Sequence, residues 1–188
     1  LFISCNNETE WKYLFNGENL DGWEIKIREY KIGENFKNTF KVDNGAIKVS
    51  YEEYDEFDKK FGHIFYVKEK FKNYHLSLDY KFSGSHLKGA PGWSIKNSGI
   101  MLHCQDPYTM LIDQEFPVSS EAQLLGGLGE GERSTANMCS PGTDVDIDGS
   151  LAQYHCINSS SKTFHEDDWV NVEVIVYSDS LIHHFVEG

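Results

Sequence analysis

The sequence feature that constrains this fold most is a regular alternation of apolar and polar residues. In residues 75–82 (HLSLDYKF) every second residue is leucine, tyrosine or phenylalanine, and in residues 169–177 (WVNVEVIVY) valine occupies every second position. Successive side chains of a β-strand point to opposite faces of its sheet. Both segments are therefore predicted to be strands with one buried and one exposed face.

Long helical periodicity is nearly absent from the rest of the chain. Glycine, proline, asparagine, aspartate and serine separate short apolar runs, which predict further strands. We therefore expect an all-β protein, an antiparallel two-sheet sandwich formed by residues 11–188 as one domain. Residues 83–97 and 127–143 are predicted to be long loops, and residues 53–62 a surface loop or one helical turn. The further predicted strands are AIKVS, GHIFYVKEKF, SGIMLHCQ, EAQLLGG, LAQYHCI and SLIHHFVEG.

Composition limits the kinds of partner that the chain can bind. Its 188 residues are 39% hydrophobic and 14% aromatic, which is enough to fill a real core. The formal net charge of −13 would repel nucleic acid and anionic lipid head groups, so neither is expected as a partner. No Gly-x-Gly-x-x-Gly motif follows a strand into a helix, so no nucleotide cofactor is indicated. Neutral ligands or cations fit this composition better.

Four cysteines bear on export and cross-linking. The start of the chain, LFISC, resembles the end of a bacterial lipoprotein signal, so we expect residues 1–10 to be a signal remnant and tether with a lipidated Cys5. The protein would then be exported, and periplasmic or anchored to the outer membrane, where disulfides can form. Cys139 and Cys156 flank a predicted hairpin and could be joined across it. Cys104 lies in an apolar run and is expected to be a buried thiol.

The stretch PGTDVDIDGSLAQYHC, residues 141–156, allows two interpretations. Three alternating aspartates from Asp144 to Asp148, followed by Gly149, begin like a calcium loop of the EF-hand type. The twelfth position of such a loop should be a glutamate, but here it is His155, so the EF-hand does not fit. The pair Asp148-Gly149 instead predicts a two-residue hairpin turn whose second strand carries His155. A single calcium ion bound by two of the aspartates stays an alternative.

Candidate chemistry comes from polar residues at alternate positions of two predicted strands. In IMLHCQ, His103 and Gln105 would share a face with Met101, and in EAQLL, Glu121 and Gln123 would share a face. If these strands were neighbours, the four polar side chains would form a patch able to hold hydroxyl groups. The alternative is an ordinary solvated sheet face. Further predicted members of this patch are Gln153, His155 and Lys162.

Three motifs together resemble a known family. YLFNGENLDGWE (residues 13–24), NSGIMLHC (97–104) and EAQLLGG (121–127) are similar, in this order and spacing, to motifs of the bacterial 3-keto-disaccharide hydrolases. The resemblance covers nearly all of residues 11–188 and implies a concanavalin A-like jelly roll that continues beyond the last residue given. Many members of that family carry arginine where His103 stands, so the substrate of this chain is expected to differ.

The resemblance implies an elimination on a keto sugar. A ketone at C3 acidifies the C2 proton, a base removes this proton, the enolate expels the glycosidic oxygen from C1, and water then adds back. A divalent cation held by His103, Glu121 and His155 is an alternative means of stabilising the enolate. The implied roles are Glu121 or His103 as base, Gln105 and Gln123 as groups that hold hydroxyls or the carbonyl, His155 as a second acid or base, and Lys162 as a nearby cation.

Two other functions compete with this one. A jelly roll also hosts lectins, so the chain could be a non-catalytic carbohydrate-binding module of a surface lipoprotein. A cell-surface interaction domain without sugar specificity would suit the acidic composition, but it leaves the His, Glu and Gln residues unexplained.

Overall fold

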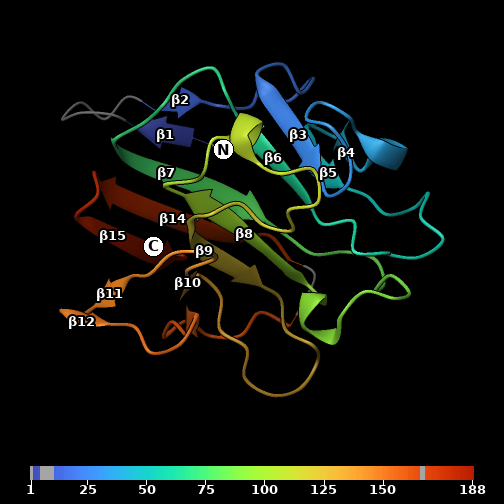
Figure 1. The fold of residues 1–188 in the computed structure, drawn as a ribbon. Helices are drawn as coiled ribbons and strands as arrows, with labels where there is room; N and C mark the ends of the chain where they lie inside the picture. The colour runs from blue at the N-terminus through green and yellow to red at the C-terminus, as the bar shows by residue number, and fades with distance from the viewer. Residues whose placement is uncertain (1, 5–10, 166–167) are drawn as a thin grey trace.

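A computed structural model describes residues 2–4, 11–165 and 168–188 of the chain (Figure 1). Strands and turns make up nearly all of the regular structure, and the helical segments found within these ranges are short 3-10 turns. The predicted all-β class is therefore confirmed. These turns are Phe36–Asn38 (η1), Gly92–Ser94 (η2) and Pro107–Thr109 (η3).

One layer of the sandwich is an antiparallel sheet in the order β15-β14-β7-β1-β2. Its central strands, β7 and β14, are the two segments whose alternation is strongest, and they pair from Val170 opposite Tyr80 to Tyr177 opposite Asn73. The period-two pattern thus predicted both strands correctly. The bounds are Phe2–Ser4 (β1), Lys12–Tyr13 (β2), Asn73–Tyr80 (β7), Val170–Tyr177 (β14) and Leu181–Val186 (β15).

The other layer is an antiparallel sheet in the order β13-β10-β9-β8. The two strands that carry the NSGI and E-x-Q motifs are direct neighbours in it, with Met101 opposite Glu121 and Gly99 opposite Gln123. β8 and β9 are therefore neighbouring strands, as the predicted polar patch requires. The bounds are Asn97–Leu102 (β8), Ser120–Leu125 (β9), Asn137–Cys139 (β10) and Cys156–Ile157 (β13).

The core lies between these two sheets. Val174 and Val176 of β14 pack in one cluster with Leu102 and Ala122, which come from the facing sheet. Both valines and Ala122 are fully buried. The antiparallel two-sheet sandwich is therefore confirmed, while the full jelly-roll connectivity stays a prediction. Because these apolar residues alternate with polar ones, the opposite face of β8 and β9 carries Glu121 and Gln123 away from the core.

Smaller antiparallel pairs flank the sandwich (Figure 1). Ile25, Ile27 and Ile64 pack against Phe40 in a separate apolar cluster. Lys26, which is paired with a histidine across β3 and β6, lies on the opposite face and is only 3% exposed. The bounds are Trp23–Ile27 (β3) with Gly62–Tyr66 (β6), Phe40–Asp43 (β4) with Ala46–Val49 (β5), and Asp146–Ile147 (β11) with Ser150–Leu151 (β12).

The hairpin predicted at Asp148-Gly149 is present. Strands β11 and β12 pair across this turn, in which φ is 51° at Asp148 and 79° at Gly149, as a type I′ turn requires. The strand predicted over LAQYHCI is wrong, because β12 ends at Leu151 and β13 begins only at Cys156. A part of the predicted loop 127–143 is likewise a strand, β10. Both differences arise in short strands, which give little periodicity to detect.

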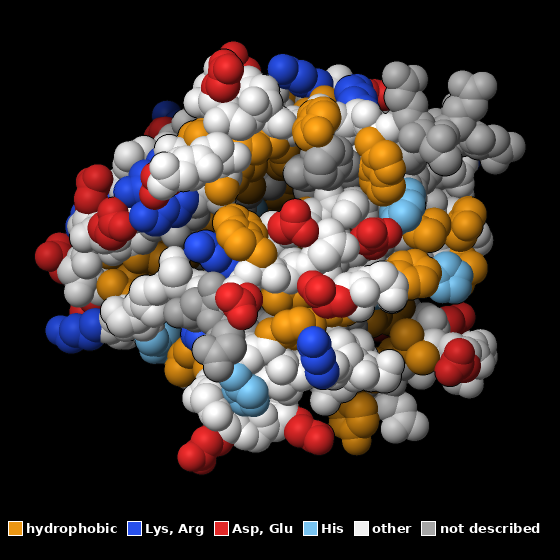
Figure 2. Space-filling view, turned by 180° about the vertical axis from the view of Figure 1, so that it is seen from behind, with side chains coloured by type: hydrophobic (Ala, Val, Ile, Leu, Met, Phe, Trp, Pro, Cys, Tyr) orange, Lys and Arg blue, Asp and Glu red, His pale blue; other side chains and the backbone are white. Residues whose placement is uncertain are grey.

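The molecular surface carries charged and hydrophobic side chains close to one another. Figure 2 shows acidic side chains scattered over the face opposite to the view of Figure 1, with hydrophobic and histidine side chains exposed between them. On the outer side of β14 and β15, Tyr177, Leu181 and Phe185 are exposed, which follows from their alternation with core residues. Within the predicted tether, residues 2–4 instead form β1 of the sandwich, and Ile3 packs in the core, whereas Cys5 lies outside the described residues. No helix in the described part of the chain is long and apolar enough to cross a membrane.

The predicted disulfide between Cys139 and Cys156 is confirmed. It joins β10 to the short strand β13 and closes a segment with a sequence separation of 17. Replacing both cysteines with alanine is expected to lower the free energy of unfolding by about 3 kcal/mol, because the unfolded chain regains the entropy of that loop. Denaturant unfolding measures this change. Dithiothreitol should destabilise the wild type by a similar amount and leave the double variant unaffected, and equal stability of all these forms would contradict the prediction.

Candidate active site

The centre of the candidate site is Glu121, on the face of β9 that points away from the core. Its neighbours across the ladder are Met101 on β8 and Cys139 on β10. The carboxylate lies over the backbone of Gly99, where an added Cβ would be only 2.1 Å from Oε1 of Glu121. The NSGI motif therefore provides a glycine at a position where any side chain would displace this carboxylate.

Glu121 has an unusual electrostatic environment. It is partly buried, and within the described residues its carboxylate makes no hydrogen bond or ion pair. Burial alone raises the pKa of Glu121 to about 7, with no neighbouring charge contributing. A carboxyl group with this pKa is ionised in about half of the molecules near neutral pH, and it can take up a proton from a weak carbon acid far better than an exposed glutamate can.

Gln123 lies beside Glu121 on the same face of β9, as the sequence predicted. Its Oε1 accepts a hydrogen bond of 3.1 Å from Nδ2 of Asn137, which is 2% exposed. Asn137 is fixed in turn, since its Oδ1 accepts from Ser134 Oγ (2.8 Å) and from the Ser159 backbone N–H (2.9 Å). With its oxygen engaged, Gln123 presents its NH₂ group as a hydrogen-bond donor on the Glu121 side of the sheet.

Arg133 and Asn97 lie at one end of the sheet face that carries Glu121 and Gln123. The side chains of both residues donate to the backbone carbonyl of Trp93, from Asn97 Nδ2 at 3.0 Å and from Arg133 Nη2 at 3.5 Å. Nη1 of Arg133 also donates to the carbonyls of Gly126 (2.5 Å) and Lys96 (3.1 Å). One guanidinium group therefore ties the loop after β9 to the loop before β8.

An aromatic cluster containing a histidine lies next to this end. Phe61 is 4.8 Å from Phe116 and 5.8 Å from Trp93 between ring centroids, and the His63 ring is 5.6 Å from Phe116. Burial, together with the nearby Lys26 ammonium group, lowers the pKa of His63 to about 4, so its imidazole is neutral at pH 7. Sequence reasoning missed His63, because nothing in GHIFYVKEKF separates a buried histidine from an exposed one.

His103 and Gln105 do not share the sheet face that carries Glu121. Strand β8 ends at Leu102, and His103 has a φ of 48°, so the expected alternation of Met101, His103 and Gln105 on one face is wrong. His103 is exposed just beyond the end of β8. Gln105 instead fixes the following loop, since its Oε1 accepts from Gln114 Nε2 (2.7 Å) and its Nε2 donates to Thr109 Oγ1 (3.2 Å).

His155 and Lys162 are also separate from the Glu121 surface. His155 is exposed and precedes β13, and it is held through its backbone carbonyl, which accepts from the Ser140 N–H at 3.0 Å. The Lys162 ammonium lies 4.8 Å from the centroid of the Phe164 ring. Gln153 is exposed in the bend between β12 and β13. The predicted patch therefore contains Glu121 and Gln123, and its other predicted members lie elsewhere.

The described residues give no support to a metal centre. Searched over residues 2–4, 11–165 and 168–188, His, Cys, Asp and Glu side chains form no group of three that could hold an ion. The set of His103, Glu121 and His155 is therefore not assembled. The aspartates from Asp144 to Asp148 are exposed around their hairpin.

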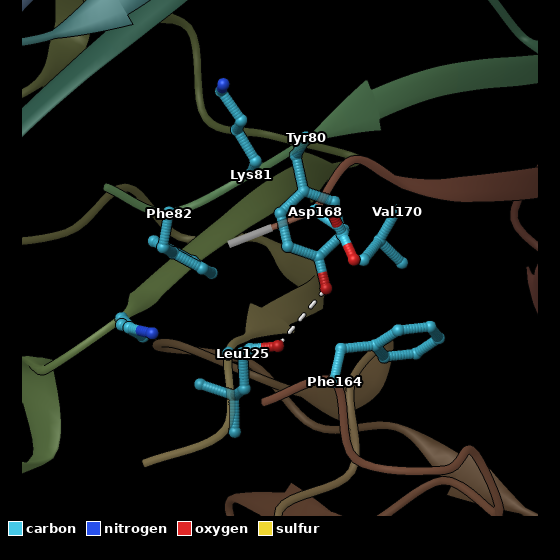
Figure 3. Close-up of a pocket in the computed structure, with 9 residues that line it drawn as sticks. Tyr80, Lys81, Phe82, Leu125, Phe164, Asp168 and Val170 are labelled. Atoms are coloured by element: carbon cyan, nitrogen blue, oxygen red, sulfur yellow. Dashed lines mark hydrogen bonds between the residues drawn. The ribbon is translucent and has the colours of Figure 1, made fainter. Parts of the chain in front are cut away.

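The pocket shown in Figure 3 lies at one end of the sandwich and does not contain Glu121. The enclosed space is small, about 10 Å³. Inside it, Tyr80 donates a hydrogen bond of 3.2 Å to the Leu125 carbonyl and lies 2.7 Å from Thr135 Oγ1. The hydroxyl group of Tyr80 thus connects the two sheets at this pocket. The lining residues are Tyr80, Lys81, Phe82, Lys96, Leu125, Gly126, Phe164, Asp168 and Val170.

Comparison with known proteins assigns the chain to a family. The family described as the 3-keto-alpha-glucoside-1,2-lyase-like domain matches residues 10–188, which is nearly the whole chain. No curated protein matches, and no solved structure does. The matched segment includes β8 and β9, with Gly99 and Glu121, and also Arg133. The chain therefore belongs to the 3-keto-alpha-glucoside-1,2-lyase-like family, as its three motifs predicted.

Proposed function

We propose that the protein cleaves 3-keto-glycosides by elimination across C1 and C2, with Glu121 as the base. The observation that carries this proposal is the environment of Glu121, which is partly buried, unpaired among the described residues, and raised in pKa to about 7. The family description, a 1,2-lyase of 3-keto-glucosides, names the same two carbon atoms. A base of this kind suits a proton made acidic by an adjacent ketone.

The reaction can be written with all bonds accounted for. The Glu121 carboxylate takes the proton from C2, and the electrons of the C–H bond form an enolate with the C3 carbonyl. The enolate then re-forms the ketone as the C1–O bond breaks, which releases the alcohol, once protonated, and leaves a C1=C2 double bond. Addition of water to that double bond gives the free 3-keto sugar, and release before this step gives the unsaturated ketone.

Gln123 is suited to stabilise the enolate. Its NH₂ group is directed away from Asn137, because Asn137 occupies its oxygen. A preoriented amide donor lowers the energy of negative charge that develops on a carbonyl oxygen. Since buried Asn137 is held by Ser134 and Ser159, the orientation of Gln123 is set before substrate binds.

Ordinary glycosidase chemistry fits this site less well. That chemistry needs two carboxyl groups on either side of the glycosidic bond. Among the described residues no neighbouring charge contributes to the pKa of Glu121, so none of their carboxylates acts on it. In an α-glucoside the C2–H and C1–O bonds also lie on opposite faces of the ring. The group that protonates the leaving oxygen is therefore another residue or water, and not Glu121.

The function is tested with a 3-keto-α-glucoside and the unoxidised α-glucoside from which it is made, with products followed by mass spectrometry. We expect cleavage of the keto sugar alone, because only the ketone acidifies the C2 proton. Cleavage of both sugars at similar rates would indicate ordinary glycoside hydrolysis. Binding of the unoxidised sugar without any turnover of the keto sugar would instead indicate the lectin-like module.

A further inference from the structure

Trp93 combines exposure with a fixed position. The residue is 55% exposed, although a free-standing indole of this size is normally buried. One face of its ring is stacked on Phe61, with a centroid distance of 5.8 Å and an angle of 4° between the planes. Phe116 packs at 6.3 Å and holds the ring from a second direction. More than half of the Trp93 surface is thus accessible to a ligand although the ring is held by two neighbouring rings.

The backbone of Trp93 is also held in place, by hydrogen bonds. Its carbonyl accepts hydrogen bonds from Asn97 and Arg133, and Arg133 also binds the carbonyls of Lys96 and Gly126. The short turn η2 that contains Trp93 is closed by Ser94 Oγ, which donates to the Pro91 carbonyl at 2.7 Å. An aromatic ring that is held in this way loses little entropy when a ligand stacks on it.

Trp93 lies near the outer face of β8 and β9, which carries Glu121 and Gln123. Asn97, which binds the Trp93 carbonyl, is on the same face of β8 as Gly99, two residues or about 7 Å along the strand. The carboxylate of Glu121 lies over Gly99. Figure 1 shows η2 directly before the start of β8. A sugar ring bound at the Glu121 carboxylate therefore shares a face of β8 with Asn97, whose side chain binds the Trp93 backbone.

We propose that Trp93, backed by Phe61, is the subsite for the leaving group, and that it binds the flat ring attached through the C1 oxygen. This inference rests on the proposed function, in which Glu121 acts on C2 of the keto ring. The apolar face of a pyranose or an aromatic aglycone stacks on the exposed surface of the indole. Asn97 and Arg133 are positioning residues for this platform, and substrates with a small, non-cyclic leaving group do not use it.

The test compares two 3-keto-α-glucosides that differ only in the leaving group, methanol or p-nitrophenol. We expect Trp93→Ala to raise KM for the p-nitrophenyl substrate roughly 5- to 10-fold, the loss of one stacking contact, and to leave the methyl substrate nearly unchanged. Trp93→Phe should retain part of the preference. Trp169→Ala is the matched control, since Trp169 is also exposed (53%) but immediately precedes β14 of the other sheet and lies against Lys81.

Equal effects of Trp93→Ala on both substrates, or an equal loss of preference in Trp169→Ala, would overturn the subsite. A second measurement separates this inference from the proposed function. Calorimetric titration with phenyl α-glucoside needs no turnover, and Trp93→Ala should weaken this binding while Trp169→Ala does not. If the wild type turns over no keto sugar, the proposed function fails while this titration still decides the subsite. Unchanged binding by Trp93→Ala would reject the subsite whatever the turnover.

Discussion

Replacing Glu121 with glutamine is expected to lower kcat/KM for a 3-keto-α-glucoside by about three orders of magnitude. Glutamine has nearly the same shape, so it preserves the packing over Gly99 while it removes the carboxylate that is proposed to take the C2 proton. The measurement is steady-state release of the leaving group. Glu173→Gln is the matched control, because that carboxylate lies on β14 of the other sheet and is hydrogen-bonded to His75 at 2.5 Å. It should leave kcat/KM unchanged.

The pH dependence of the wild type follows from the same group. A base works only when it is deprotonated, and burial raises the pKa of Glu121 to about 7. Below about pH 7, kcat/KM should therefore fall about tenfold for each unit, and above that pH it should level off. A profile that is flat down to the usual glutamate pKa of about 4.3 would contradict the assignment. So would a Glu121→Gln variant that keeps a tenth or more of the wild-type activity.

Adding a single methyl group at Gly99 is expected to lower kcat/KM by about 100-fold, although Gly99 has no functional group. The new Cβ would stand 2.1 Å from Oε1 of Glu121, so the carboxylate must move by an ångström or more. A displacement of this size from the reacting atom typically costs about that factor. The expected change lies in kcat more than in KM, because the sugar-binding groups are untouched.

Two controls separate this effect from general damage to β8. Ser98→Ala changes the neighbouring residue on the same strand, which is exposed, and should leave activity near the wild-type level. In a Glu121→Gln background, Gly99→Ala should cause almost no further loss, since the group that it displaces is already inactive. A full additional 100-fold loss in the double variant would show that Gly99 does not act through Glu121.

The sequence predicted the strongly periodic parts of this fold well. Strand β14 alternates between buried valines and more exposed residues as its sequence predicts. In β7 the strand was predicted, but its burial departs from the pattern, because Ser77 on the polar side is buried. The turn at Asp148-Gly149 was equally clear, because few residue pairs adopt positive φ at both positions. The pairing of Cys139 with Cys156 followed from their places on either side of that hairpin.

The site was predictable only where the alternation held. Glu121 and Gln123 share a face as expected, because β9 is regular over both residues. His103 and Gln105 do not continue this pattern, because His103 adopts a left-handed φ and the regular alternation of β8 ends at Leu102. Histidine is one of the residues that tolerate this conformation, and no glycine or proline marked the end of the strand.

The supporting residues of the site depend on contacts between distant segments. Asn137 orients Gln123 across 14 positions in sequence, and it lies in a stretch that reads as a glycine-rich loop. Arg133 reaches the Trp93 carbonyl across 40 positions. Gly99 belonged to a recognised motif, but its role depends on a carboxylate from another strand. No local sequence pattern predicts these contacts between distant residues.

The fate of a deuterium label at C2 tests the central claim most directly. A 3-keto-α-glucoside that carries deuterium at C2 is incubated with the protein in ordinary water, and the sugar product is analysed by mass spectrometry. The same sugar kept with Glu121→Gln gives the background loss of label. If Glu121 removes the C2 hydron before the C1–O bond breaks, the product should have lost its deuterium and turnover should be slower than with the unlabelled sugar. Cleavage with the deuterium retained at C2 would contradict the mechanism.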